Sequence, residues 1–134
     1  MRRRLLSALV LAAVLTLGAV SAASACSYAV EPGLTPDQLD VAGLRASDGA
    51  FIGTALATFR GTAGVTYLFE VQRAVKGSFP TGFVLVRTSL TTCGLSARVG
   101  ERTGLLVDRR NGRWRADDID RIAPRDLLRA ARRG

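Results

Sequence analysis

The stretch Val65–Gly94, VTYLFEVQRAVKGSFPTGFVLVRTSLTTCG, decides the fold of this chain. Over residues 65–75 the odd positions are mostly apolar and the even positions mostly polar, with one exception at Leu68. This period-2 alternation predicts a strand with one buried face. Glycine and proline then break the pattern over residues 76–82, and Phe83–Thr88 is a second run rich in β-forming residues. We therefore predict two antiparallel strands joined by a short loop, with a cysteine just after the second strand.

Three further strands are predicted on either side of this stretch. Ala50–Phe59 precedes it, and Gly53 within that run allows a bulge or a close backbone approach. Arg102–Asp108 follows it, and a fifth strand is expected from Arg113 to about Asp117. Asn111-Gly112 lies between these two strands and predicts a type I′ hairpin, because both central positions of that turn need positive φ. Alternation places five aromatic side chains in the core: Phe51, Phe59, Tyr67, Phe69 and Phe83.

Two short helices are expected, one on each side of the strands. Thr35-Pro36-Asp37 has the pattern of an N-cap, a first helical position and an acidic first turn, and the helix would end before Asp48-Gly49. Pro124 can begin a second helix, and an apolar stripe runs from there into a basic C-terminus: Leu127, Leu128 and Ala131. Five strands with one or two short helices predict an all-β fold, a small closed barrel.

The first 25 residues have the pattern of a signal peptide. Arg2, Arg3 and Arg4 form a basic start, residues 5–20 are apolar or small, and Ala23-Ser24-Ala25 fits the small-x-small cleavage rule. Cleavage would leave a secreted, extracellular chain of 109 residues that begins at Cys26, and residues 26–134 would form a single domain with a basic C-terminal helix or tail. The apolar run is short for a membrane span.

Composition limits the kinds of partner and the chemical activities that we expect for this chain. Residues 26–134 hold 16 Arg and Lys against 11 Asp and Glu, a net charge of +5. The charges are scattered, so we expect a solvated surface on a monomer and no nucleic-acid partner. The chain has no histidine, and it lacks phosphate-binding and triad motifs. We therefore expect no enzyme activity and no cofactor, and we interpret Asp117, Asp118 and Asp120 as solvated or ion-paired rather than as a calcium site.

Cys26 and Cys93 are an even number of cysteines in an exported chain, so a disulfide between them is the default expectation. It would close a loop of 68 residues, counted inclusively, and the chain-entropy model gives about 4 kcal/mol for such a loop. An alternative is lipidation of Cys26, since small residues precede it. Lipidation would attach the protein to a membrane, block the α-amino group and leave Cys93 as an odd thiol.

Several of these motifs occur in the order of a known family. They are a strand that ends in Val75-Lys76-Gly77, a Ser/Thr-rich segment into Cys93-Gly94, an upstream Phe51–Thr54, and Val99–Arg102 before Leu105–Val107. In this order they resemble bacterial secreted proteins related to tissue inhibitors of metalloproteinases (TIMPs), over roughly residues 26–107. The resemblance implies a five-stranded OB-fold-like barrel of the TIMP and netrin type.

The resemblance also implies a function for the new N-terminus. In that family the first residue is a disulfide-bonded cysteine whose free α-amino group and carbonyl chelate the catalytic zinc of a protease. Cys26 would play this part in trans, and the small hydroxyl residue Ser27 would point into the specificity pocket of the protease. Family members commonly carry a second cysteine at the position of Tyr28. Two readings stay open beside inhibition of an extracellular zinc metalloprotease. In one, Cys26 serves only to staple the N-terminus to the barrel; in the other, the chain is a non-inhibitory cell-surface structural or adhesion module that binds a protein or a wall polymer.

Overall fold

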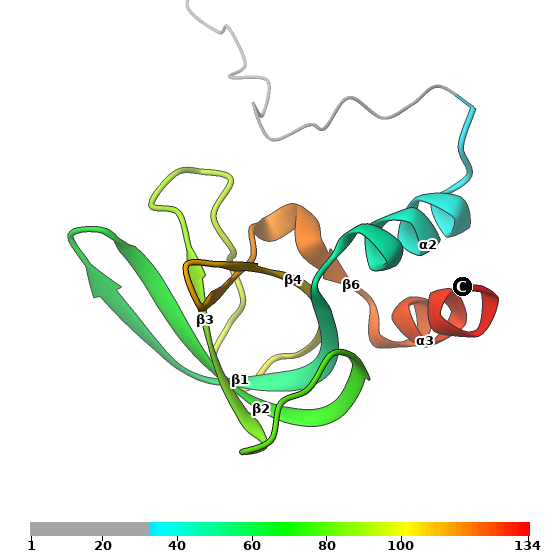
Figure 1. Cartoon of the computed structure of the whole chain (residues 1–134). Coiled ribbons are helices and arrows are strands. Elements are labelled where there is room, and N and C mark those ends of the chain that lie inside the picture. The colour runs from blue at the N-terminus through cyan, green and yellow to red at the C-terminus, as the bar shows by residue number, and fades with distance from the viewer. Residues whose placement is uncertain (1–32) are drawn as a thin grey trace, which may run out of the picture.

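The computed structural model describes residues 33–134, which form a mostly β-structure with two helices (Figure 1). The elements in chain order are α2 (Pro36–Ala46), β1 (Gly49–Gly61), β2 (Gly64–Lys76), β3 (Phe83–Thr88), β4 (Arg102–Arg110), β5 (Arg113–Arg115), the 3₁₀ turn η1 (Asp118–Asp120), β6 (Arg121–Ile122) and α3 (Pro124–Arg133). The strands predicted from residues 65–75 and 83–88 are therefore present, and they pair antiparallel in one register from Val65 opposite Thr88 to Glu70 opposite Phe83.

The six strands form one sheet in the order β1-β2-β3-β5-β4-β6, and the sheet curls into a partial ring. The ring arises because β1 pairs with β2 along one edge and with β4 along the other. All pairings are antiparallel except that of β3 with β5, which is parallel. The short strand β6 adds to β4 opposite Gly104 and Leu105.

Strand β1 has three irregularities in its pairing with β2, the first of them between Ala50 and Phe51. The second lies between Ile52 and Gly53, where a side chain on Gly53 would come within 2.4 Å of the carbonyl oxygen of Glu70. The third lies between Ala55 and Ala57. Bulges of this kind increase local twist and curvature. The prediction that Gly53 permits a bulge and a close backbone approach is confirmed.

The concave side of the sheet encloses the larger of two apolar clusters. Phe51 and Phe69 are fully buried there with ring centroids 5.5 Å apart, and Tyr67 lies beside Phe69. The buried members of this cluster are Phe51, Ala55, Tyr67, Phe69, Val84, Val86, Leu95, Ala97, Leu105, Val107 and Ala116. Three of the five aromatics predicted for the core are therefore in it.

The other two aromatics are exposed, and the prediction for them was wrong. Phe59 is 56% and Phe83 51% exposed. The irregularity between Ala55 and Ala57 shifts the alternation by one residue. Thr58 is therefore opposite the inward-facing Tyr67, and Phe59 is opposite Thr66 on the convex side. Phe83 is on the same face of β3 as Leu85 and Arg87, because the buried residues of that strand are the ones between them.

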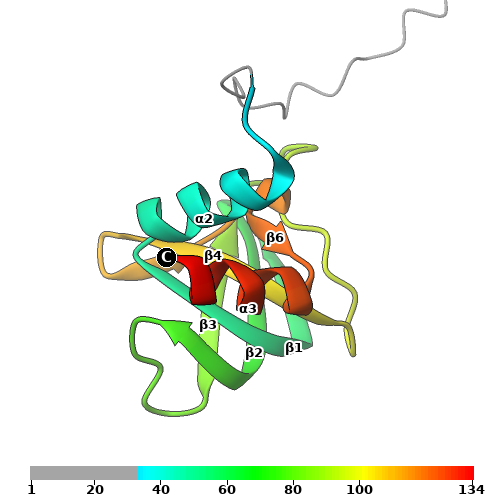
Figure 2. The same ribbon diagram turned by 90° about the vertical axis from the view of Figure 1, so that its right-hand side faces the viewer.

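The two helices cover the convex face of β1 and β4, and they lie against one another (Figure 2). A second cluster fills this layer: Leu44, Ala50, Ile52, Leu106, Leu127 and Ala130. Strands β1 and β4 are consequently buried on both faces, as the fully buried neighbours Ala50, Phe51 and Ile52 show. A single-face alternation did not predict this second layer.

The ends of the helices and hairpins follow the local sequence. The Thr35 hydroxyl accepts the backbone N–H of Gln38, and the Gln38 side chain accepts the backbone N–H of Thr35, which together form a capping box at the start of α2. Asn111 and Gly112 have φ values of 51° and 73°, as the predicted hairpin requires. In α3 Leu127 is buried as predicted, but Ala131 is exposed and Ala130 takes its place in the core.

Candidate functional site

The residues predicted to act on a partner, Cys26 and Ser27, lie outside the described residues, and so does the predicted signal peptide. The disulfide from Cys26 to Cys93 therefore stays a prediction. Cys93 itself is described, is half-buried, and is not a free cysteine. No helix within residues 33–134 is long and apolar enough to cross a membrane. The site can be built only from the segment that holds Cys93, residues 89–101, which we call the Cys93 loop.

The Cys93 loop is tied to the segment after β5 by backbone bonds. The N–H of Asp118 donates to the carbonyl oxygen of Cys93 at 3.0 Å, and Gly94 forms an antiparallel bridge with Asp117. The N–H of Gly94 donates to the carbonyl oxygen of Thr91 at 2.9 Å. A side chain on Gly94 would come within 2.2 Å of the carbonyl oxygen of Ser89, so only glycine fits this turn without a shift. Cys93 is thus held by paired backbone on both sides.

Buried side chains fix the same loop from the core. Leu95 is buried, and its N–H donates to the Thr88 hydroxyl at 2.6 Å while its carbonyl oxygen accepts the Tyr67 hydroxyl at 2.7 Å. Burial raises the pKa of Tyr67. The Thr88 hydroxyl in turn donates to a carboxylate oxygen of Asp117 at 3.1 Å. The side-chain hydroxyls of Tyr67 and Thr88 and the backbone of Leu95 all have hydrogen-bond partners, which fixes the loop to the fold.

The acidic residues after β5 also help to hold the Cys93 loop in place. Asp118 accepts the Ser96 hydroxyl at 2.9 Å and pairs with Arg121 at 3.3 Å, and Arg121 also pairs with Glu101. The Ser96 hydroxyl bond and the Arg121 pair lower the pKa of Asp118. Asp120 accepts the N–H of Asp117 at 2.7 Å, although burial raises its pKa. The carboxylates of this cluster therefore bind the protein's own donors, and among them Asp118 is ion-paired as predicted.

Two large apolar side chains lie exposed near Cys93. Leu90 belongs to the Cys93 loop and is 51% exposed, and Ile119 follows the residue that bonds to Cys93 and is 43% exposed. They leave apolar surface open to a partner beside the Cys93 loop. The sequence reading had assigned no role to either of them.

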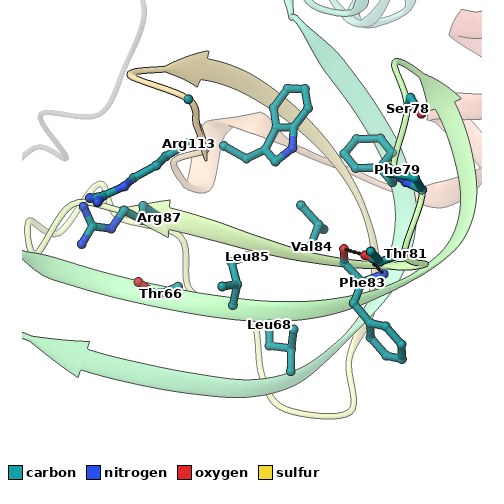
Figure 3. A pocket seen from close by; sticks show the side chains of 13 residues that line it. Thr66, Leu68, Ser78, Phe79, Thr81, Phe83, Val84, Leu85, Arg87 and Arg113 are labelled. Carbon is teal, nitrogen blue, oxygen red and sulfur yellow. Dashed lines mark hydrogen bonds between the residues drawn. The ribbon is translucent and has the colours of Figure 1, made fainter.

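A separate pocket lies between β3 and the hairpin that joins β4 to β5, with a volume of about 730 Å³ (Figure 3). The β2–β3 loop closes one side of it through Phe79 and Pro80. The full lining is Thr66, Leu68, Ser78, Phe79, Pro80, Thr81, Phe83, Val84, Leu85, Arg87, Gly112, Arg113 and Trp114. We call this space the β3 pocket.

The β3 pocket was missed in the sequence because Phe83 was placed in the core. Arg87 carried the missing signal. Arg87 lies two residues after Leu85 and four after Phe83, so the three side chains share one face of the strand. Because Arg87 is charged, that face is the outer one. Trp114 is partly buried and also lines this pocket. Its ring packs against Phe79 at 5.3 Å and the guanidinium of Arg109 lies 5.3 Å from its centroid.

Neither the scan of protein-family models nor the search of curated proteins finds a match for this chain. The function must therefore be argued from the residues themselves.

Proposed function

We propose that this chain is a secreted binding domain of the TIMP-like, OB-fold type, and that its N-terminus inhibits a zinc metalloprotease. The Cys26 α-amino group and carbonyl oxygen would chelate the catalytic zinc of the protease, and Ser27 would enter its specificity pocket. A disulfide from Cys26 to Cys93 would hold the N-terminus on the Cys93 loop.

The strand order supports the fold part of this proposal. Pairing runs from β1 through β2, β3, β5 and β4 and returns to β1. A five-stranded, partly open Greek-key barrel needs a pairing order that comes back to its first strand. The sixth strand, β6, has only two residues and adds to the outside of this order.

The rigidity of the Cys93 loop is the observation that carries the functional part. An N-terminus attached at Cys93 would be anchored to backbone that Asp117 and Asp118 hold by a bridge and a hydrogen bond. A chelating group that is already fixed in place loses less entropy on binding than a free chain end. Leu90 and Ile119 would supply apolar contact beside it.

The chemistry of the amine suits this role. An α-amino group has a pKa near 7.7–8.0, so zinc displaces its proton at small cost near neutral pH. The chain has one lysine among its residues after the signal peptide, Lys76, whose ammonium group donates to three backbone carbonyl oxygens. An amine-directed reagent near pH 7 would therefore modify the N-terminus selectively.

The first experiment measures the intact mass of the exported protein before and after reduction. The proposal expects a chain that begins at unmodified Cys26 and gains the mass of two hydrogens on reduction. A diacylglyceryl adduct, or two free thiols in the exported protein, would overturn it.

The second experiment measures inhibition across a panel of secreted zinc metalloproteases. One alanine added before Cys26 moves the α-amine away from the carbonyl of Cys26 and should abolish inhibition, while the same alanine added after Gly134 should leave it unchanged. Acylation of the α-amine should also abolish it. A surface module that uses another face would bind its partner equally well with either addition, and that result would contradict the proposal.

A further inference from the structure

The β3 pocket has a polar end and an apolar end. Arg87 and Arg113 extend to the same end, away from Phe79 and Phe83 at the other (Figure 3). Leu68, Val84 and Leu85 line the space between. We propose that this pocket binds a small anionic amphiphile, a monocarboxylate with an acyl or aromatic body, whose carboxylate lies between the two arginines. This binding is separate from the function proposed for the N-terminus.

The arginines give the reason for a negative charge. Their strands are paired neighbours, with Val86 opposite Trp114 and Arg87 opposite Arg115. Arg115 faces Asp108 across the next strand pair, whereas Arg113 faces another arginine, Arg110. Neither Arg87 nor Arg113 takes part in an ion pair within residues 33–134. Guanidinium groups bind carboxylates through paired, charge-assisted hydrogen bonds, so two unneutralised groups at one end favour an anion.

The rest of the lining gives the reason for an apolar body. It contains no amide or carboxylate side chain, and its hydroxyl groups are those of Thr66, Ser78 and Thr81. The Thr81 hydroxyl already donates to the carbonyl oxygen of Phe83 at 2.9 Å and accepts its N–H at 3.3 Å. A sugar polymer would find few partners for its hydroxyl groups here, and leaving them unpaired is unfavourable. An acyl chain or an aromatic ring has no hydroxyl groups that need such partners.

The same Thr81 bonds argue against an added peptide strand. Strand addition needs a row of open N–H and C=O groups along a sheet edge. Thr81 covers those of Phe83, and β5 already pairs with β3 at Val86 and Arg87. The edge left for a peptide is too short for a ladder. The pocket volume of about 730 Å³ lies within the range of small-ligand sites.

Trp114 makes the proposal measurable, because it is the one tryptophan of the chain and lines the pocket. The probe is dodecanoate, titrated below its micelle concentration while the fluorescence of Trp114 is followed. We expect a saturable shift to shorter wavelength as the acyl chain replaces water. Acetate and dodecyltrimethylammonium are the matched probes, the first without the apolar body and the second with a positive head, and neither should saturate the site.

Variants test the two ends separately. Arg87→Gln with Arg113→Gln should weaken dodecanoate binding about tenfold or more, as expected for lost hydrogen bonds to a charged group. Leu85→Gln should weaken it by introducing a polar group against the acyl chain. The control is Arg45→Gln with Arg132→Gln, which removes the same charge from exposed helix positions and should leave affinity within about twofold, since distant charges are screened. Circular dichroism confirms that each variant is folded.

Three results would overturn the proposal. They are the absence of saturable dodecanoate binding, equal binding of the cationic amphiphile, and equal weakening by the control pair. Vesicles of anionic phospholipid separate a membrane from a free ligand. We expect that the protein does not bind these vesicles in a way that dodecanoate can displace. If it does bind them, and the Arg87 and Arg113 changes abolish that binding, the surface would be assigned to a membrane instead.

Discussion

Lys76 shows how one side chain joins two parts of the fold. Its ammonium group donates to the carbonyl oxygens of Leu44 and Arg45, each at 2.9 Å, and to that of Ser47. These carbonyls end α2, where the last turn has no helical partners and the helix dipole favours a cation. This contact could not be predicted from the sequence, because Lys76-Gly77 has only the local pattern of the end of a strand. The turn reading is correct, since β2 ends at Lys76 and Gly77 has a φ of 79°.

Replacing Lys76 should therefore destabilise the protein. Lys76→Met keeps the length of the side chain but leaves partly buried carbonyl groups without a donor. We expect a loss of about 1–3 kcal/mol in the free energy of unfolding, measured by urea denaturation. Arg73→Met, an exposed position on the same strand, is the control and should change stability little. Equal losses for the two variants would mean that the Lys76 bonds contribute nothing beyond general charge.

At the scale of elements, α3 shows which kind of interaction attaches a helix to the sheet. Its Arg129 and Arg133 pair with Asp37 at the start of α2, at 3.1 Å and 2.6 Å. These pairs lower the pKa of Asp37, with the Arg129 hydrogen bond as the first cause, but all three side chains are substantially exposed. Leu127, by contrast, is fully buried in the cluster beneath both helices. Exposed ion pairs contribute little, so burial should dominate.

Leu127→Ala should lower the free energy of unfolding by about 2–5 kcal/mol, the range for a fully buried leucine. Asp37→Asn should change it little, because the ion pairs it removes are solvated. Leu90→Ala, at an exposed position, serves as the control for loss of the same side chain. Chemical denaturation of all three variants decides the question. If Asp37→Asn lowered the free energy of unfolding more than Leu127→Ala does, the ion pairs and not the buried leucine would be the main attachment of the helix.

The same elements show what local sequence predicts and what it does not. Local sequence, within a few positions, predicts the approximate positions of β1 to β5, the hairpin at Asn111-Gly112 and the cap at Thr35, but not β6. The faces of β1 did not follow, because a bulge after Ala55 changes which side chains point inward and the helices bury the outer face as well. The pocket beside β3 also required the tertiary placement of the β4–β5 hairpin. Alternation describes one strand at a time, and these features depend on two or more.

At the scale of the whole molecule, charge balance controls the response to acid. Residues 26–134 carry 16 basic and 11 acidic side chains, so protonating the carboxylates leaves a strong positive excess that favours unfolding. Individual aspartates affect the pH dependence of stability in opposite directions, because the fold shifts their pKa values in opposite directions. The pKa of Asp118 is lowered in the folded protein, first by the Ser96 hydroxyl and then by Arg121, whereas the pKa of Asp120 is raised by burial.

The sign of each effect follows from linkage. A depressed pKa in the folded state adds stability above the unfolded value, near 3.8 for aspartate, and that contribution is lost as pH falls through the lower folded value. A raised pKa has the opposite effect, because the ionised form of Asp120 is disfavoured by the fold at neutral pH. Asp118→Asn should thus destabilise the protein at pH 7, whereas Asp120→Asn should not, since an amide oxygen can still accept the N–H of Asp117.

Thermal unfolding from pH 7 down to pH 2.5 measures this difference. We expect the Asp118→Asn variant to melt below the parent protein at pH 7 and the two melting temperatures to converge below about pH 4, where the parent loses its Asp118 contribution. The Asp118 carboxylate also fixes Ser96 in the Cys93 loop, so the acid loss should begin at that loop and slow amide exchange should be lost there first. A constant gap between the two proteins across the pH range would show that Asp118 acts through hydrogen bonding alone and not through its charge.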